Sequence, residues 1–362
     1  MTESVYIHIP FCKSKCKYCS FVSVVYQGLQ NSYVSALLSE IEFRYNSEPL
    51  KTLYFGGGTP SQLSPAEVET IIKQFNISGK TEVTFEINPD DADLEYLKAL
   101  KSLGINRLSF GVQTFNDEIL KYIGRRHDSK TALKALDNSK SAGFTNISID
   151  LIYGLPFQTG ESLKQDLETV KTLDLRHIST YGLKIEEPSY FYYNQPQNTP
   201  DDDLQADMYL EVNDFLENIG YKRYEISNFA KIGYESRHNL NYWNNSEYYG
   251  FGAAAHGYEN GVRYANSSDI QEYINNPLKH SSENKLTVKE KLEEEIFLGF
   301  RRETGINVEE INTKYNIDFD KKYEQTLKKY TSDYILPTET GYKLTLNGVL
   351  LSNNILAEFI DL

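Results

Sequence analysis

The chain has 362 residues, of which 40% are hydrophobic and 24% charged, and its formal net charge is −14 at pH 7. This length and apolar content are typical of a globular protein with one large and one smaller domain, or with two domains. The acidic balance argues against a general nucleic-acid-binding protein, which would carry a basic face. No apolar run approaches the ~20 residues of a membrane-spanning helix, and the first residues lack the pattern of a signal peptide. We therefore expect a cytoplasmic protein that is not embedded in a membrane and binds no nucleic acid.

Residues 4–183 alternate short strand-like runs with segments of helical periodicity. The strand candidates are residues 5–9, 52–55, 82–87, 107–111, 147–152 and 178–183. One of the helix starts is Ser64-Pro65-Ala66-Glu67, which predicts a capping box with proline in the first helical position. Six β units separated by helices predict parallel strands with right-handed crossovers, as a doubly wound sheet or a barrel. A complete eightfold barrel takes about 250 residues, so an α/β fold with a partial (β/α)6 barrel fits this region best.

The pattern changes after about residue 190. Residues 196–203 are polar and acidic and are predicted to form a loop, which precedes a helix around residues 208–216 and an aromatic stretch. The last segment begins helical and ends with an apparent hairpin at residues 342–346 and a final helix containing Leu350, Leu351 and Ile355. We predict three parts, namely the barrel over residues 1–190, an extension over 191–285 and a winged-helix-like cap over 286–362.

Three cysteines, Cys12, Cys16 and Cys19, follow the first strand at C-x3-C-x2-C spacing and are the only cysteines in the chain. Soft thiolates at such close spacing suit iron or zinc. Three thiolates leave one iron of a [4Fe–4S] cluster without a protein ligand and free to bind a small molecule. A zinc site completed by His8 or another histidine is an alternative. A disulfide framework is a weaker alternative, because the number of cysteines is odd.

Unusual residues follow the other predicted strands as well. The second strand leads into Gly56-Gly57-Gly58-Thr59-Pro60, the third ends near Glu86, the fourth near Gln113, and the fifth carries Asp150. The carboxyl ends of parallel strands meet at one rim, where chemistry collects in such folds. We therefore predict an active site at that rim. The alternatives are a plain tight turn for the glycines and a buried salt bridge for Glu86.

Two adjacent arginines, Arg125 and Arg126, lie in the segment that follows the fourth strand. A guanidinium group can bind a carboxylate through two parallel hydrogen bonds. Residue chemistry alone does not choose between the two.

The cysteine spacing resembles the signature loop of the radical S-adenosylmethionine (radical SAM) superfamily. Tyr6-Ile7-His8-Ile9-Pro10-Phe11-Cys12, the triple glycine, Ser109-Phe110-Gly111-Val112-Gln113 and Asp150-Leu151-Ile152-Tyr153-Gly154-Leu155-Pro156 further resemble the oxygen-independent coproporphyrinogen III oxidase family. The resemblance covers nearly the whole chain and implies a [4Fe–4S] cluster on the three cysteines with S-adenosyl-L-methionine (SAM) at its open iron. The SAM contacts that it implies are Tyr6, Tyr18, Gly57, Gly58, Thr59, Glu86, Gln113, Arg125 and Asp150.

Two departures from the pattern of the coproporphyrinogen dehydrogenases indicate the branch of the family that this chain resembles. The coproporphyrinogen dehydrogenases carry a further cysteine two residues after the last cluster ligand, where this chain has Phe21, and they have an extension ahead of the first strand. Both departures favour the related HemW-type heme chaperone branch. A second feature, His238-Asn239-Leu240-Asn241-Tyr242-Trp243, resembles the heme-binding H-N-x-x-Y-W motif of that branch. Imidazole is a common axial ligand of heme iron, and Tyr242 and Trp243 offer flat faces to a macrocycle.

Other interpretations of the histidines remain open. The box around His238 could instead be a packed aromatic loop that covers the barrel mouth, with the imidazole bonded to backbone. His256 is a second candidate ligand, which we expect near the SAM site or in the core. His127 and His177 are expected to be structural or surface residues.

The resemblance thus implies a heme chaperone that binds heme and passes it to heme-accepting proteins, of a respiratory or a heme-storage type. The alternative is an oxygen-independent coproporphyrinogen III dehydrogenase, which decarboxylates two propionates through a 5′-deoxyadenosyl radical. A weaker alternative is a radical SAM enzyme that methylates or opens heme. The sequence leaves open whether SAM is cleaved, which residue binds heme iron and whether the protein forms a homodimer.

Overall fold

The structure is a computed structural model that describes residues 2–25 and 27–360. At its centre lies a nine-stranded sheet with the strand order β7-β8-β6-β5-β4-β3-β2-β1-β9. Neighbouring strands from β1 to β6 are parallel. These six strands are β1 (Ser4–Ile9), β2 (Thr52–Gly57), β3 (Glu82–Ile87), β4 (Arg107–Gln113), β5 (Asn146–Tyr153) and β6 (His177–Gly182). All six predicted strands are therefore confirmed, and so is the partial parallel barrel.

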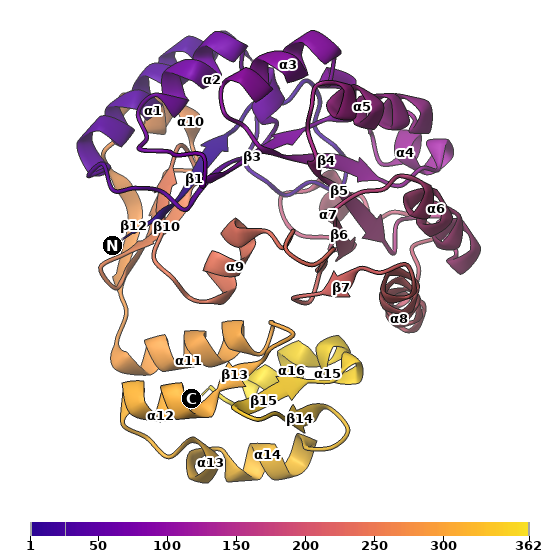
Figure 1. Ribbon diagram of the computed structural model, residues 1–362, viewed down its shortest axis with the longest axis vertical. Helices are drawn as coiled ribbons and strands as arrows, with labels where there is room; N and C mark the ends of the chain where they lie inside the picture. The colour runs from indigo at the N-terminus through magenta and orange to yellow at the C-terminus, as the bar shows by residue number, and fades with distance from the viewer. Residues whose placement is uncertain (1, 26, 361–362) are drawn as a thin grey trace.

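Helices cover the outer face of this sheet in an arc (Figure 1). They are α1 (Gln30–Arg44), α2 (Pro65–Ile72), α3 (Leu94–Ser102), α4 (Asp117–Tyr122), α5 (Ser129–Ser141) and α6 (Gly160–Thr172), with short 3-10 turns η1 (Gln27–Leu29), η2 (Pro60–Gln62) and η3 (Pro89–Asp91). Ser64 caps α2, and its side chain and that of Glu67 form the predicted capping box. The box satisfies backbone N–H groups that the first helical turn would leave without partners.

Most positions of the strands alternate between apolar and polar side chains. The apolar positions, such as Ile7, Phe55, Phe85 and Leu108, are buried in the core beneath the helices. The alternate positions face the inside of the barrel, because successive side chains of a strand point to opposite faces. These inward positions include Tyr6, Tyr54, Thr84, Glu86, Arg107, Ser109, Ser148, Asp150, His177 and Ser179. A closed barrel of this kind normally fills its interior with branched apolar residues, so this polar interior is suited to binding.

The region after the sixth strand contributes to the same sheet. Its elements are α7 (Tyr190–Tyr193), α8 (Asp202–Asn218), β7 (Lys222–Arg223), β8 (Asn228–Ala230), α9 (Arg237–Trp243), β9 (Tyr249–Phe251), β10 (His256–Glu259), β11 (Val262–Asn266), α10 (Ile270–Asn275) and β12 (His280–Lys285). Strand β8 pairs antiparallel with β6, and β9 pairs parallel with β1. Strands β10, β11 and β12 form a separate antiparallel sheet. The predicted loop over residues 196–203 is too long, because the Asp201 side chain accepts from the backbone N–H of Leu204 and starts α8 at Asp202.

The C-terminal part has its own apolar core, which includes Phe300, Phe319, Ile335 and Phe359. Its elements are α11 (Val288–Gly299), β13 (Ile306–Asn307), α12 (Val308–Tyr315), α13 (Phe319–Lys322), α14 (Glu324–Tyr330), β14 (Ile335–Pro337), β15 (Gly341–Leu344), α15 (Leu346–Leu350) and α16 (Ser352–Ala357). The antiparallel order β13-β15-β14 beside these helices is winged-helix-like, as expected. The predicted single final helix is wrong, because Leu351 has non-helical backbone angles and separates α15 from α16.

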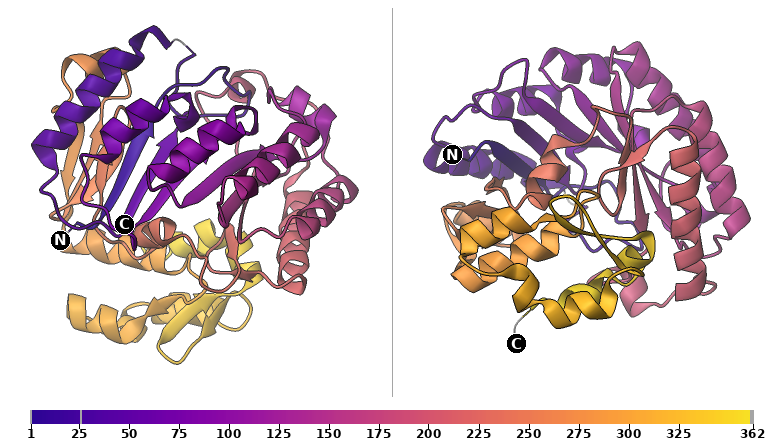
Figure 2. Two further views of the ribbon diagram at one scale, coloured as in Figure 1. Left: turned by 45° about the horizontal axis from the view of Figure 1, so that its top comes forward. Right: turned by 60° about the horizontal axis from the view of Figure 1, so that its bottom comes forward.

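The C-terminal part lies next to α9, on the side of the barrel away from the arc of α1 to α6 (Figures 1 and 2). Helix α9 contacts both β2 and α11, so it lies between the barrel and this part. The division of the chain at residues 190 and 285 stays a prediction, since the main sheet itself takes strands from both sides of residue 190. Within the described residues, no helix is both long and apolar enough to cross a membrane.

Candidate cluster and ligand site at the carboxyl ends of the strands

The cysteine loop directly follows β1 and is fixed on both sides by backbone hydrogen bonds. At its start, the N–H of Cys12 donates to the carbonyl of Val24 at 2.9 Å, and the N–H of Val24 donates to the carbonyl of Pro10 at 2.8 Å. Further along, the N–H of Lys17 donates to the carbonyl of Ile123 at 2.9 Å. The loop is therefore attached to the segment after it and to the end of α4, which holds the thiols at the rim.

The three thiols are partly sheltered from solvent. Cys12 is buried, and Cys16 and Cys19 are half-buried. Burial raises the pKa of the Cys12 thiol, and it raises the pKa of Cys19 to about 11. Iron binds thiolates, so loading a cluster must displace these protons.

The donor set fits a cluster better than a single zinc ion. In the described part of the chain, no three histidine, cysteine or acidic side chains converge on one metal ion. A [4Fe–4S] cluster binds each thiolate on a different iron, so its ligands need not converge on one point. His8, the proposed fourth zinc ligand, is engaged elsewhere: its Nε2 donates to the carbonyl of Val22 at 2.9 Å, and its Nδ1 lies 3.1 Å from the Tyr6 hydroxyl. The zinc alternative therefore has no support in the structure.

A chain of hydrogen bonds connects two of the thiols through neighbouring strand ends. Arg125 donates from Nη1 to Sγ of Cys16 at 3.5 Å and from Nη2 to Oδ1 of Asn88 at 2.7 Å. Asn88 in turn donates to the hydroxyl of Thr59 at 3.0 Å, and that hydroxyl lies 3.3 Å from Sγ of Cys12. The end of β3 and the turn after β2 are thereby joined to the cysteine loop.

Gly57, the last residue of β2, and Gly58, which follows it, are required by close packing against β1 and the cysteine loop. Gly57 has a φ of +108°, and a Cβ at this position would lie 2.7 Å from the imidazole of His8. A Cβ at Gly58 would lie 2.9 Å from the carbonyl oxygen of Ile9, to which the Gly58 N–H donates. Without side chains, this backbone is also open to close approach by a ligand.

Two carboxyl groups lie on the inner face near the same rim. Glu86 accepts a hydrogen bond from the Tyr54 hydroxyl at 2.7 Å, and burial raises its pKa to about 7. Asp150 accepts from the Ser109 hydroxyl at 3.2 Å, and burial raises its pKa as well. Both carboxyl groups can accept hydrogen bonds from hydroxyl or ammonium groups of a ligand. Such hydrogen bonds would stabilise the carboxylate form, which burial disfavours.

Gln113 ends β4 in a strained conformation. Its φ is +72°, and the register between β4 and β5 shifts between Gly111 and Gln113. A Cβ on Gly111 would lie 2.9 Å from Nε2 of Gln113 and 3.3 Å from Nη2 of Arg125. The irregularity therefore places the amide of Gln113 and the guanidinium of Arg125 over the same glycine. Strain of this kind is concentrated at functional sites.

The structure thus brings most of the predicted site residues to one rim. They are Cys12, Cys16, Cys19, Gly57, Gly58, Thr59, Glu86, Gln113, Arg125 and Asp150. Tyr6 lies inside the barrel with its ring 6.1 Å from that of Tyr54, and Tyr18, in the cysteine loop itself, packs against an apolar cluster that includes Ile123. Arg126 points elsewhere and pairs with Asp90 at 3.3 Å, so Arg125 is the arginine of this site.

His238 lies at the opposite end of the barrel. Its Nδ1 lies 2.8 Å from the hydroxyl of Thr52, the first residue of β2, and its Nε2 lies 2.8 Å from the hydroxyl of Tyr242. Its backbone N–H donates to Glu82, the first residue of β3, at 3.0 Å. The side chain is 1% exposed, and burial lowers its pKa to about 3. The H-N-x-x-Y-W box is therefore a helix, α9, that closes the amino-terminal end, and side chains rather than backbone bind its imidazole.

The remaining histidines have structural positions or lie on the surface. His177 is buried at the start of β6, with Nδ1 2.8 Å from the Ser148 hydroxyl and Nε2 2.7 Å from the Tyr224 hydroxyl. His127 is buried and bonds to the carbonyl of Val112. His256, which was expected near the SAM site or in the core, is exposed at the start of β10 and so lies outside the core, but its charge acts on His8, whose imidazole packs against Gly57.

Two residues of the barrel interior were missed at the level of sequence. Asn88 bonds to both Thr59 and Arg125, and Arg107 is buried inside the barrel. The signal for both is the period of two in β3 and β4, which places Asn88 on the face of Glu86 and Arg107 on the face of Ser109.

Comparison with known proteins agrees with this geometry. Residues 6–170 match the radical SAM superfamily, and residues 286–351 match the HemN C-terminal domain. Coproporphyrinogen III oxidase (HemN) from Escherichia coli, a radical SAM enzyme, has the same fold with a TM-score of 0.86 at 24% sequence identity, covering 99% of this chain and 89% of that chain. The chain is thus a protein of the radical SAM class with a HemN-like fold.

Two relatives define the family more closely. Heme chaperone HemW of Lactococcus lactis subsp. lactis is 39% identical over 99% of this chain and 97% of its own length. Heme chaperone HemW of Bacillus subtilis is 39% identical over 99% of this chain and 99% of its own length. The chain belongs to the HemW family of heme chaperones.

Proposed function

We propose that the protein binds heme and transfers it to acceptor proteins, carrying a [4Fe–4S] cluster and SAM at the rim of its barrel. The observation that carries this proposal is the full-length similarity to HemW proteins, combined with Phe21 in place of a further cysteine after the cluster loop. Phe21 is 66% exposed, so its side chain lies on the surface beside the loop. A cytoplasmic location and respiratory or heme-storage acceptors belong to the same proposal.

Cys12, Cys16 and Cys19 would hold the cluster, which supplies an open iron and one electron when it is bound. The rim offers groups for each part of SAM. Within the described residues, Nε of Arg125 is a buried donor without a hydrogen-bond partner, so it is free to meet the carboxylate of the methionine part. The backbone at Gly57 and Gly58 allows close approach of the amino acid part. Glu86 and Asp150 would accept hydrogen bonds from ribose hydroxyls or the ammonium group.

Heme is assigned to the region of the H-N-x-x-Y-W box. Tyr242 lines a pocket of about 660 Å³ between this box and α11, together with Tyr248, Arg263, Leu286 and Phe297. Its aromatic and apolar side chains suit the faces of a porphyrin. The Tyr242 hydroxyl is also the partner of His238 Nε2, so the imidazole becomes available to iron in this pocket only if Tyr242 moves.

The test is an anaerobic hemin titration of the reconstituted protein, followed by visible absorbance. His177→Ala is the matched control for His238→Ala, because each imidazole is buried at the amino-terminal end between a short hydroxyl side chain and a tyrosine hydroxyl. We expect saturable one-to-one binding by the wild type and by His177→Ala, and weakened binding by His238→Ala. Equal losses of hemin affinity in both variants would show that His238 acts as a structural residue and not as a heme ligand. No binding by the wild type would favour the coproporphyrinogen dehydrogenase, which a decarboxylation assay would then establish.

A further inference from the structure

Three neighbouring polar residues inside the barrel each have a side-chain atom without a partner. Thr84, Arg107 and Asn146 lie side by side on β3, β4 and β5, since Thr84 pairs in register with Arg107 and Arg107 with Asn146. Paired residues of adjacent strands point to the same face. In the part of the chain that the structure describes, Oγ1 of Thr84, Nε of Arg107 and Oδ1 of Asn146 are buried without a hydrogen-bond partner.

Arg107 is the only charged residue of this row, so its burial costs the most free energy. The residue is 2% exposed, and its Nε is buried without a hydrogen-bond partner in segments 2–25 and 27–360. Burial raises the pKa of Glu86 and of Asp150, and the charge of Arg107 acts against this rise in both groups. A buried cation without a partner is strongly unfavourable, and proteins compensate such a charge with an anion or a network of hydrogen bonds. The row therefore has the features of a site whose partner comes from outside the chain.

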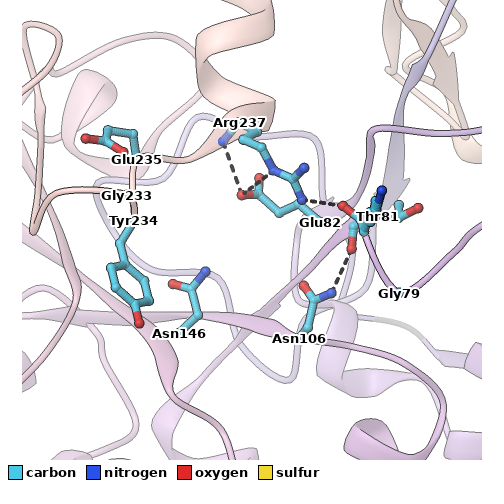
Figure 3. A pocket seen from close by; sticks show the side chains of 10 residues that line it. Gly79, Thr81, Glu82, Asn106, Asn146, Gly233, Tyr234, Glu235 and Arg237 are labelled. Atoms are coloured by element: carbon cyan, nitrogen blue, oxygen red, sulfur yellow. Dashed lines mark hydrogen bonds and ion pairs between the residues drawn. The ribbon is translucent and has the colours of Figure 1, made fainter.

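A pocket of about 320 Å³ opens at this end of the barrel (Figure 3). Its lining includes Asn106, Asn146, Tyr234, Glu82 and Arg237. Figure 3 shows the Arg237 side chain held beside Glu82 on one side, with Asn106 and Asn146 below it. Asn146 belongs both to this pocket and to the row, so the pocket reaches the row at Asn146, while Thr84 and Arg107 are not among its lining residues.

We propose that this end of the barrel binds a small carboxylate ligand that carries a hydroxyl or amino group, entering through the pocket. The guanidinium of Arg107 and the hydroxyl of Thr84 supply donors for the carboxylate, which an arginine binds through two parallel hydrogen bonds. The Oδ1 of Asn146 accepts from the ligand's own hydroxyl or amino group. The site lies at the amino ends of the strands, opposite the cysteine loop and the proposed SAM site, and next to α9, whose Arg237 lines the pocket and whose His238 feels the charge of Arg107.

The test is calorimetric titration of the full-length protein with sodium lactate, with sodium chloride and sodium phosphate at matched ionic strength. Thr84→Val is the first variant, because valine has nearly the shape of threonine and replaces a buried hydroxyl that has no partner among the described residues. We expect it to fold normally and to bind lactate about tenfold more weakly, which is the loss for one hydrogen bond to a charged group. Arg107→Met should abolish binding. Arg126→Gln removes a cation at the opposite rim, where Arg126 pairs with Asp90, and should bind as the wild type does.

A second readout is the fluorescence of Trp243, the only tryptophan of the chain, which lies in α9 at this end of the barrel. We expect a saturable change with lactate in the wild type, with the midpoint shifted in Thr84→Val. Equal lactate affinities in the wild type and Thr84→Val, or equal effects of lactate and chloride, would overturn the proposal and leave ordered water as the partner of these atoms. Binding of phosphate without binding of lactate would overturn the assigned ligand class.

Discussion

Arg125 Nη1 lies 3.5 Å from Sγ of Cys16, and this contact joins the segment after β4 to the cysteine loop. The same guanidinium donates to Asn88 at the end of β3. A fixed cation next to a thiolate stabilises the charged form of the ligand. The rim therefore couples the predicted cluster ligands to the residues expected to contact SAM.

Replacing Arg125 by lysine keeps the charge and removes the planar fork of donors. We expect Arg125→Lys to retain iron–sulfur absorbance and to bind SAM at least about tenfold more weakly, because lysine cannot reproduce two directed hydrogen bonds. Equilibrium dialysis of reconstituted protein with labelled SAM measures the change. Arg126→Lys is the control, since the Arg126 side chain is 43% exposed and pairs with Asp90 away from the site. An equal loss in the control would remove Arg125 from its proposed role.

Removal of one cysteine should remove the cluster. We expect Cys16→Ala to show no iron–sulfur absorbance after anaerobic reconstitution, because two thiolates do not hold a four-iron cluster stably. Ser14→Ala, in the same loop, changes no thiol and should give the wild-type spectrum. A full cluster in Cys16→Ala would mean that the ligands have been misidentified.

The strands and the rim could be predicted because their signals are local. Alternation of apolar and polar residues fixes both the existence of a strand and the face of each side chain, and Ser64 and Glu67 specify a helix start within four residues. The position of His238 could not be predicted in this way. Its partner Thr52 lies 186 residues away in the sequence, and the two meet only when α9 packs across the amino ends of the strands.

The polar interior was visible in the sequence but was not interpreted. Strands of a parallel sheet that is buried on both faces usually read as continuous apolar runs. Here, Arg107, Ser109 and Gly111 alternate with apolar residues, as do the inward positions of β3 and β5. That alternation predicts a hydrophilic interior as well as the strands themselves.

The turn at Gly57 should tolerate no side chain. We expect Gly57→Ala to lower the free energy of unfolding by about 1–3 kcal/mol, because alanine at positive φ is strained and its Cβ would meet the imidazole of His8. Urea denaturation of the cluster-free protein measures the change. Gly79→Ala is the matched control, since a Cβ there meets nothing within 4 Å, and its effect should stay within about 0.5 kcal/mol. Equal effects of the two substitutions would mean that the turn is not constrained as described.

The burial of His238 predicts a dependence of stability on pH. Its pKa is lowered from 6.5 to about 3, chiefly by burial, so the unfolded chain binds a proton that the folded chain excludes. The contribution of His238 to the free energy of unfolding is fully present above about pH 6.5 and is lost as the pH falls toward 3. Burial acts in the opposite sense on Asp166, whose pKa is raised to about 6, so its contribution is lost as the pH rises. The pH dependence of the total unfolding free energy therefore contains contributions of opposite sign. Only the difference between the wild type and a His238 variant isolates the contribution of the histidine.

We therefore expect the difference in unfolding free energy between the wild type and His238→Gln to become smaller as the pH is lowered from 6.5 to 4.5. The change approaches about 1.4 kcal/mol per pH unit once the unfolded imidazole is fully protonated. Urea denaturation of cluster-free protein at several pH values measures it. A constant difference would show that His238 takes up a proton in the folded protein, which requires that water or another partner reach an imidazole that Thr52 and Tyr242 now enclose. The same opening would be needed for iron to reach Nε2, so this titration also bears on how heme could be bound at α9.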